Sequence, residues 1–549
     1  MTRPRIAIIL GMSSLIGFFI LRWIQRTPTE ADIRYHPVIL SAQNSTRRLT
    51  ISAKVACVLR VQRLTGFLVA AFVGFCGGHV RAGQETTDPK APEVRARHHS
   101  VSLTLRAVIG PDGRDSFSFN GRTDAPVWRA SPGDQLKIIY VNDLPPKPRE
   151  SCVIPPCMDM TNLHFHGLEV SPNAPQDDVL DMIAMPGQTL NYRVDIPKDH
   201  PPGLYWYHTH PHGESYQQVR DGMSGAIVIE GIERYVPELR GLREQILMVR
   251  GREIKNDPKA AELKQRVELS GESCGSEAEE PEEIFTVNGA VRPHIAIAPG
   301  ERQFWRIVNA SADRYLDLEV TRGSFDVVAM DGMPLAYHDP DHPTRVAEHV
   351  LLSPAGRLEA IVTGPAVRSS AFLRTRCVDT GPVGDPNPAM VLADLVPGPP
   401  NLSRSSNEEN AQPPAYKRID LAAEQNAPPR FVVVFTEDKN GFYINGKKFD
   451  ANAAPMVQAK LGTYQHWRIV NATDELHPFH IHQTHFLAYA ENGHAVADPL
   501  WLDTVNVPYS GTVDVILDFT NPLIKGMSVF HCHLLNHEDK GMMAKILFQ

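Results

Sequence analysis

The sequence lacks both a long basic run and a long apolar run. Its 549 residues carry a formal net charge of −8, and the absence of a basic stretch gives no support to nucleic-acid binding. The two apolar runs near the N-terminus, residues 6–21 and 64–78, are shorter than the roughly 20 residues that a membrane-spanning helix needs. Since charge and hydropathy identify no partner, the function has to be inferred from motifs.

The first 82 residues are predicted to be an export or anchor segment. Residues 64–78 follow a basic stretch and precede Val80-Arg81-Ala82, a small-residue cleavage site of the kind that ends a secretory signal. Arg47-Arg48 fits a twin-arginine signal, and residues 1–50 are either a membrane anchor or a wrongly assigned start. We expect an exported monomer, periplasmic or extracellular.

Cysteine is also scarce. The part of the chain after Ala82 holds only Cys152, Cys157, Cys274, Cys377 and Cys532. If Cys532 is set aside as a metal ligand, the other four can pair in three ways, and the sequence does not choose among them. This usage fits an oxidising compartment.

What the sequence does contain is an internal repeat of about 160 residues. Each copy has an Asn-Gly turn, a gap and an alternating strand, and the three strands end at Asn142, Asn309 and Asn471. Alternating runs between Pro/Gly turns are typical of β-sandwiches, so we expect an all-β chain of three related domains. Their predicted limits are 98–237, 238–396 and 415–549, with a polar, Pro-rich linker at 397–414.

Four clusters of metal-ligating side chains stand out: HFHG, WYHTHPHG, HPFHIH and HCHLLNHEDKGM. With His212 set aside, they supply ten histidines, one cysteine and one methionine: His164, His166, His208, His210, His477, His480, His482, His531, Cys532, His533, His537 and Met542. A single His-X-His pair is often a surface pair or part of a zinc site, but structural zinc takes four ligands from closed Cys/His sets. Ten histidines around one cysteine exceed such a set.

The spacing of these motifs suits β-strands, on which residues i and i+2 face the same side. In the HCH motif the two histidines then face one way and Cys532 the other, so one strand contacts two metal sites. With His477, His537 and Met542, the cysteine completes two imidazoles, a thiolate and a weak axial thioether, which is the ligand set of a blue-copper electron-transfer site. The eight remaining histidines suit three further copper ions with positions left open for oxygen.

The four motifs, in this order, resemble the copper-binding motifs of three-domain multicopper oxidases such as laccases, ascorbate oxidase and the bacterial copper efflux oxidase. The resemblance covers roughly residues 100–549 and implies three cupredoxin-like Greek-key β-sandwich domains with four copper ions. It implies a type 1 copper on His477, Cys532, His537 and Met542, a type 2 copper on His164 and His480, and two type 3 coppers on His166, His208 and His533 and on His210, His482 and His531. The middle domain has no ligand at the aligned positions, and we expect it to be structural or substrate-facing.

The implied activity is the reduction of dioxygen to water with electrons that enter at the type 1 copper. We expect Glu538, Asp177 or Asp178 to relay protons to the three-copper cluster; the alternative for each is a solvated surface carboxylate. His212 and His485 are expected to lie beside the ligands or at the surface.

The reductant is expected to be a phenol or another aromatic molecule. Only Met456 and Met527 lie between Ala415 and His531, where the copper efflux relatives carry a methionine-rich insert. A metallo-oxidase for Cu(I), Fe(II) or Mn(II) is the alternative, and it should need carboxylates or methionines beside the type 1 histidines. A non-catalytic copper-binding envelope protein is the third possibility.

Overall fold

A computed structural model describes residues 91–146, 159–255, 257–268, 283–366, 370–398 and 416–549. The predicted export segment, most of the predicted linker, and three of the cysteines (Cys152, Cys157 and Cys274) lie outside these residues, so those predictions stay untested. Cys377 is disulfide-bonded. Among the described residues, no helix has both the length and the apolar character needed to span a membrane.

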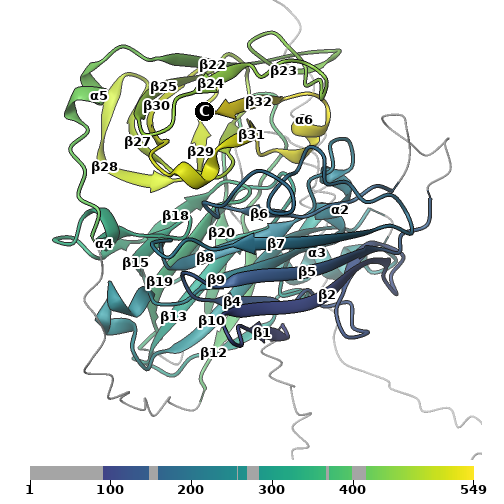
Figure 1. Cartoon of the computed structure of the whole chain (residues 1–549). Coiled ribbons are helices and arrows are strands. Elements are labelled where there is room, and N and C mark those ends of the chain that lie inside the picture. The colour runs from purple at the N-terminus through teal and green to yellow at the C-terminus, as the bar shows by residue number, and fades with distance from the viewer. Residues whose placement is uncertain (1–90, 147–158, 256, 269–282, 367–369, 399–415) are drawn as a thin grey trace, which may run out of the picture. The chain divides into compact units, whose positions relative to one another are not determined.

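The described residues form six β-sheets, two from each predicted domain, which confirms the all-β prediction (Figure 1). The N-terminal pair has the strand orders β1-β4-β9-β8-β6 and β3-β2-β5-β7. Their bounds are β1 Glu93–Arg95, β2 Ser100–Ile109, β3 Asp115–Ser118, β4 Val127–Ala130, β5 Gln135–Asn142, β6 His164–His166, β7 Thr189–Asp195, β8 Gly203–His208 and β9 Ser224–Ile229. Strand β1 precedes the predicted limit at residue 98 because three residues paired in parallel with β4 carry no alternating signal.

The middle pair has the orders β11-β10-β13-β19-β15-β16, with β17 beside β15, and β12-β21-β20-β14-β18. The bounds are β10 Arg243–Glu253, β11 Glu283–Val287, β12 His294–Ala296, β13 Arg302–Asn309, β14 Leu316–Val320, β15 Phe325–Met330, β16 Met333–Pro334, β17 Arg345–Ala347, β18 His349–Leu352, β19 Arg357–Thr363, β20 Ala371–Arg376 and β21 Met390–Val396. Two short helices, α3 Ala260–Val267 and α4 Leu335–His338, lie between these strands in the sequence.

The C-terminal pair has the orders β23-β22-β25-β30-β27-β28 and β24-β32-β31-β26-β29. The bounds are β22 Phe431–Asp438, β23 Gly441–Ile444, β24 Val457–Ala459, β25 Tyr464–Asn471, β26 His477–Ile481, β27 Phe486–Glu491, β28 His494–Leu502, β29 Thr504–Val507, β30 Thr512–Asp518, β31 Gly526–Cys532 and β32 Met543–Phe548. Helix α5 spans Ala422–Asn426 and α6 spans Leu535–Asp539, whereas α2 (Ser215–Asp221) belongs to the N-terminal part.

The sequence repeat corresponds to one recurring element. The alternating strands β5, β13 and β25 end at Asn142, Asn309 and Asn471, and each pairs in parallel with the first long strand of its own domain, β2, β10 or β22. In all three Asn-Gly turns both residues have positive φ, for example 50° at Asn120 and 77° at Gly121, as a type I′ turn requires. The repeat therefore builds the same parallel strand pair three times.

Each pair of sheets encloses a hydrophobic core of its own. Trp128, Trp305 and Trp467, one in each core, are all fully buried. Strand β2 alternates buried and exposed positions from Val101 to Ala107, whereas β4 and β9 are buried along their whole length. Separate cores fix the strand ends independently, so side chains at those ends can be brought together from different domains.

Candidate metal centre

Two antiparallel strand pairs carry the histidine motifs. Strand β6 pairs with β8 and places His164 opposite His208, whereas β26 pairs with β31 and places His480 opposite His531. In the same register Cys532 lies opposite Phe479, and both belong to the core of the C-terminal domain. The pleat therefore separates the cysteine from its flanking histidines.

Eight of the histidines form one buried cluster, which we call the histidine cluster. Its members are His164, His166, His208 and His210 from the N-terminal domain and His480, His482, His531 and His533 from the C-terminal domain, none more than 1% exposed. The Nε2 atom of His531 lies 3.2 Å from Nε2 of both His210 and His482. Across the domain boundary the rings of His164 and His482 stack at 3.7 Å between centroids.

The cluster holds ring nitrogens that have no protein partner. They are Nε2 of His164, His208 and His480, Nδ1 of His166 and His482, and both ring nitrogens of His533. Burial and the neighbouring imidazoles lower the pKa of His166, His480 and His482 well below the ordinary value, so these rings are neutral and offer lone pairs. Leaving such a group unsatisfied in a dry interior costs about 1–3 kcal/mol, and metal ions coordinated by these nitrogens would satisfy them.

Protein oxygens on the far side of several rings fix which nitrogen faces inward. Nδ1 of His164 lies 3.0 Å from a carboxylate oxygen of Asp177, and Nε2 of His166 lies 3.1 Å from Oδ1 of Asp503. Nδ1 of His480 lies 2.8 Å from the main-chain oxygen of Asp503. These contacts hold the inward nitrogens unprotonated, which is the form that binds a metal.

A second, smaller group lies on the Cys532 side of β31. Nδ1 of His477 is 3.3 Å from Sγ of Cys532 and 3.4 Å from Nδ1 of His537. Met542 is fully buried in the same core, and its main chain bonds both neighbours, because its oxygen accepts from the N–H of Cys532 and its N–H donates to the oxygen of His537. The structure thus brings these four predicted residues together, with His537 held on the short helix α6.

A pocket beside this second group is lined by carboxylates, and we call it the acidic pocket. Its lining includes Asp313, Asp385, Glu475 and His537. Oε1 of Glu475 lies 3.5 Å from Nε2 of His537 and 4.0 Å from Nε2 of His477. Burial and a hydrogen bond with Glu437 raise the pKa of Glu475 to about 9, and burial together with Glu283 raises the pKa of Asp313 to about 7. The pocket concentrates more acidic groups than it can keep ionised without a cation.

The three predicted relay carboxylates differ in position. Asp177 is buried against His164 and also accepts a hydrogen bond from Gln483. Glu538 is fully buried. Its Oε2 atom lies 3.8 Å from Nε2 of His210 and has no hydrogen-bond partner. Asp178, by contrast, is not brought to the cluster, because its carboxylate accepts from the main-chain N–H groups of Leu180 and Asp181 and closes a turn.

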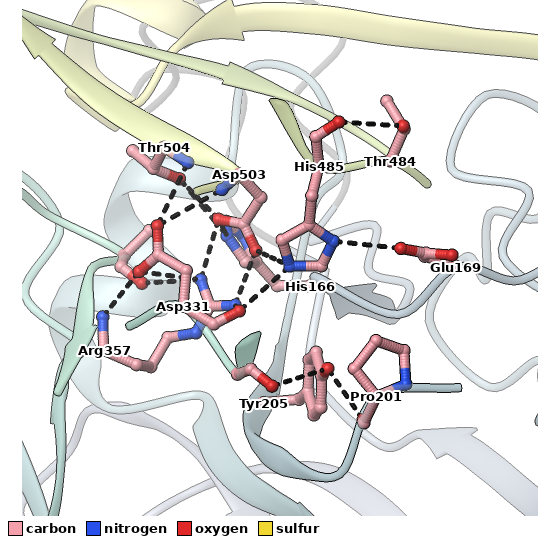
Figure 2. A network of polar contacts seen from close by, with 12 residues as sticks. His166, Glu169, Pro201, Tyr205, Asp331, Arg357, Thr484, His485, Asp503 and Thr504 are labelled. Atoms are coloured by element: carbon pink, nitrogen blue, oxygen red, sulfur yellow. Dashed lines mark hydrogen bonds and ion pairs between the residues drawn. The ribbon is translucent and has the colours of Figure 1, made fainter. Parts of the chain in front are cut away.

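Sequence reasoning missed three charged residues next to the cluster. Asp503, Arg357 and Asp331 are all buried and form the polar network of Figure 2. His485 belongs to the same network, with Nδ1 3.2 Å from Glu169 and Nε2 3.0 Å from the main-chain oxygen of Asp331. It therefore lies beside the ligands. His212 is also largely buried, and its ring packs against Phe449. No spacing rule indicates the three, because Arg357 begins strand β19, whereas Asp331 and Asp503 lie in short connections between strands.

Comparison with known proteins agrees with this geometry. Two models of multicopper oxidase domains match residues 106–234 and 416–549, which contain every histidine of both groups. The chain belongs to the multicopper oxidase family. As a member of that family it is a copper-binding, cupredoxin-like oxidase that uses dioxygen and a reductant.

The relatives of this multicopper oxidase carry different enzyme names. A multicopper oxidase of Staphylococcus aureus is 24% identical over 84% of this chain and 92% of its own length, and a laccase of Haloferax volcanii is 27% identical over 71% of this chain and 67% of its own. A solved structure from Campylobacter jejuni, described as a metallo-oxidase, superposes with a TM-score of 0.62 at 25% identity, covering 84% of this chain and 94% of that one.

The contrast between Asp177 and Asp178 gives a test of the cluster. Asp177→Asn removes one acceptor from His164 and should weaken copper retention at the histidine cluster by about tenfold or more, while the blue absorption of the Cys532 site persists. Copper per chain after dialysis against a chelator measures this. Asp178→Asn is the matched control and should behave as wild type; equal copper loss in both variants would contradict the positioning role of Asp177.

Proposed function

We propose that this oxidase holds four copper ions in two sites. The type 1 ion would be held by His477, Cys532, His537 and Met542. The type 2 ion would be held by His164 and His480, and the type 3 pair by His166, His208 and His533 and by His210, His482 and His531. The arrangement of the two groups around β31 supports this assignment, since His210, His482 and His531 converge within 4.8 Å, as do His477, Cys532 and His537.

When bound, the copper ions would supply the redox chemistry, taking electrons one at a time from the reductant and delivering four of them to dioxygen to give water. The chain supplies the connection between the sites, because Cys532 is covalently continuous with His531 and His533. It also excludes water, since the cluster histidines are almost entirely buried.

The reductant that the geometry supports best is a divalent metal ion such as Fe(II) or Mn(II). The observation that carries this proposal is the carboxylate of Glu475, whose oxygen lies 3.5 Å from the outer nitrogen of His537. With Asp313 and Asp385 it supplies oxygen ligands that suit Fe(II) or Mn(II), whereas Cu(I) prefers sulfur. Among the described residues that line the acidic pocket there is no methionine.

A phenolic reductant is the second candidate. It is the expectation from the scarcity of methionine, and relatives named laccase support it at low identity. A phenol would donate its electron at the edge of His537 without needing the carboxylates. The two candidates therefore differ in their dependence on Glu475.

Glu475→Gln tests whether the reductant is a metal ion or a phenol. It should raise the KM for Fe(II) or Mn(II) by about tenfold or more, because a carboxylate ligand is replaced by a neutral amide, and leave the KM for a phenol within about twofold. Oxygen uptake of the copper-loaded protein is the measurement. Asp474→Asn, an exposed neighbour outside the pocket lining, is the control. Robust phenol turnover with no metal-ion oxidation in the wild type would refute the metal-ion proposal.

The acidic pocket also predicts a pH dependence. Asp313 is protonated below its raised pKa of about 7, and protons compete with a metal ion for a carboxylate. Because Glu475, with a pKa of about 9, also loses its proton more readily as the pH rises, the KM for Mn(II) should fall by at least about tenfold between one pH unit below and one unit above the pKa of Asp313. Asp313→Asn should make this fall less steep. A wild-type profile that is flat, or that rises with pH, would contradict the assignment.

Glu538 is proposed to deliver protons to the histidine cluster. Its unpartnered oxygen faces His210 and His531 at 3.8 and 3.9 Å, so it is placed to hold a proton beside the oxygen-reducing site. Glu538→Gln should slow turnover by about 100-fold, the lower end of the usual range for a lost proton-transfer group, and leave the blue absorption intact. Unchanged turnover in air-saturated buffer would remove Glu538 from the mechanism.

A further inference from the structure

Arg357, the first residue of β19 in the middle domain, is fully buried and uses every donor it has. A guanidinium carries five N–H donors. Its Nη atoms form two parallel bonds to the carboxylate of Asp503, at 2.8 and 2.5 Å, and the other donors reach the main-chain oxygens of Leu204, Ala355 and Asp331. One side chain thus binds all three domains.

The carboxylate that Arg357 holds is the one that orients a cluster histidine. Oδ1 of Asp503 accepts from both Arg357 and His166, and the main-chain oxygen of Asp503 faces Nδ1 of His480 at 2.8 Å. Thr504 adds a hydroxyl 3.1 Å from the same Nδ1 atom. The segment Asp503-Thr504 therefore fixes the tautomers of two histidines assigned to different copper ions.

The middle domain also forms hydrogen bonds with the Asp503-Thr504 segment at a second point. Asp331 accepts hydrogen bonds from the main-chain N–H groups of Asp503 and Thr504 through one carboxylate oxygen, and from the N–H of Arg357 through the other. Figure 2 shows the two contacts side by side. The position of the segment is thus set from outside its own domain.

Gly167 makes the close approach possible. It ends the HFHG motif at a φ of +84°, and a Cβ atom there would lie 2.5 Å from Nη2 of Arg357 and 2.6 Å from Oδ2 of Asp503. The glycine thus leaves the space that the ion pair occupies directly behind His166.

We propose that Arg357 is a positioning residue for the oxygen-reducing site: through Asp503 it sets the orientation of His166 and His480, so that the middle domain, which supplies none of the proposed ligands, helps to build the histidine cluster. The inference rests on the proposed copper assignment. The positioning role of Arg357 differs from a general role in stability, because positioning requires the bidentate geometry of the pair with Asp503 and not only the charge.

Arg357→Lys keeps the charge and removes the bidentate pair. The copper-loaded variant should lose type 2 and type 3 copper to a chelator about 10- to 100-fold more readily than wild type, as expected for a lost outer partner of metal-bound histidines. Its type 2 electron paramagnetic resonance spectrum should change, while the blue absorption of the type 1 site stays. Thr504→Ala, a milder change on the same segment, should perturb the type 2 spectrum in the same direction even if Arg357→Lys folds poorly.

Arg306→Lys is the matched control. Arg306 lies in the same sheet, is also buried, and pairs with Glu244 and Glu359 without contacting Asp503. If Arg306→Lys releases cluster copper as readily as Arg357→Lys, or if neither Arg357→Lys nor Thr504→Ala alters the type 2 spectrum, the positioning role is overturned. A wild-type protein without type 2 and type 3 signals would instead refute the copper assignment itself.

Discussion

The convergence of eight buried imidazoles is the constraint on which the rest of this structure depends. Without a metal their inward lone pairs are unsatisfied, and each costs free energy that the surrounding fold has to offset. Two antiparallel strand pairs from separate cores fix the ring positions. Protein oxygens behind His164, His166 and His480 then fix the tautomers. The site is thus preorganised for metal by contacts that have to be made outside it.

The fold and the ligand clusters follow from local signals in the sequence. The Asn-Gly turns and the strands ending at Asn142, Asn309 and Asn471 were predictable because both depend on a few adjacent residues. The opposite facing of Cys532 and its flanking histidines follows from the period of two along a strand. Arg357 and Asp503 are 146 residues apart, and no periodicity links them. Only the packing of one domain on another reveals their pairing.

The acidic pocket also depends on the packing of one domain on another. The number of methionines between residues 415 and 531 reflects only one segment of the C-terminal domain. The acidic pocket, however, takes Asp313 and Asp385 from the middle domain and only Glu475 and His537 from the C-terminal one. These carboxylates are unremarkable in the sequence, because each follows or precedes a strand in a polar turn. Their chemistry arises from their assembly, which raises the pKa of Asp313 and Glu475.

The middle domain therefore contacts both ends of the proposed electron path. Asp313 and Asp385 face the site where electrons would enter, and Arg357 and Asp331 hold the segment behind the histidines where they would leave. A domain that had only to separate its neighbours would not need a fully buried arginine with all five donors engaged, since a buried charge is costly unless it is completely paired. Its retention is understandable if the ion pair specifies one geometry of Asp503, because a hydrophobic contact of equal strength would leave the ring of His166 free to turn.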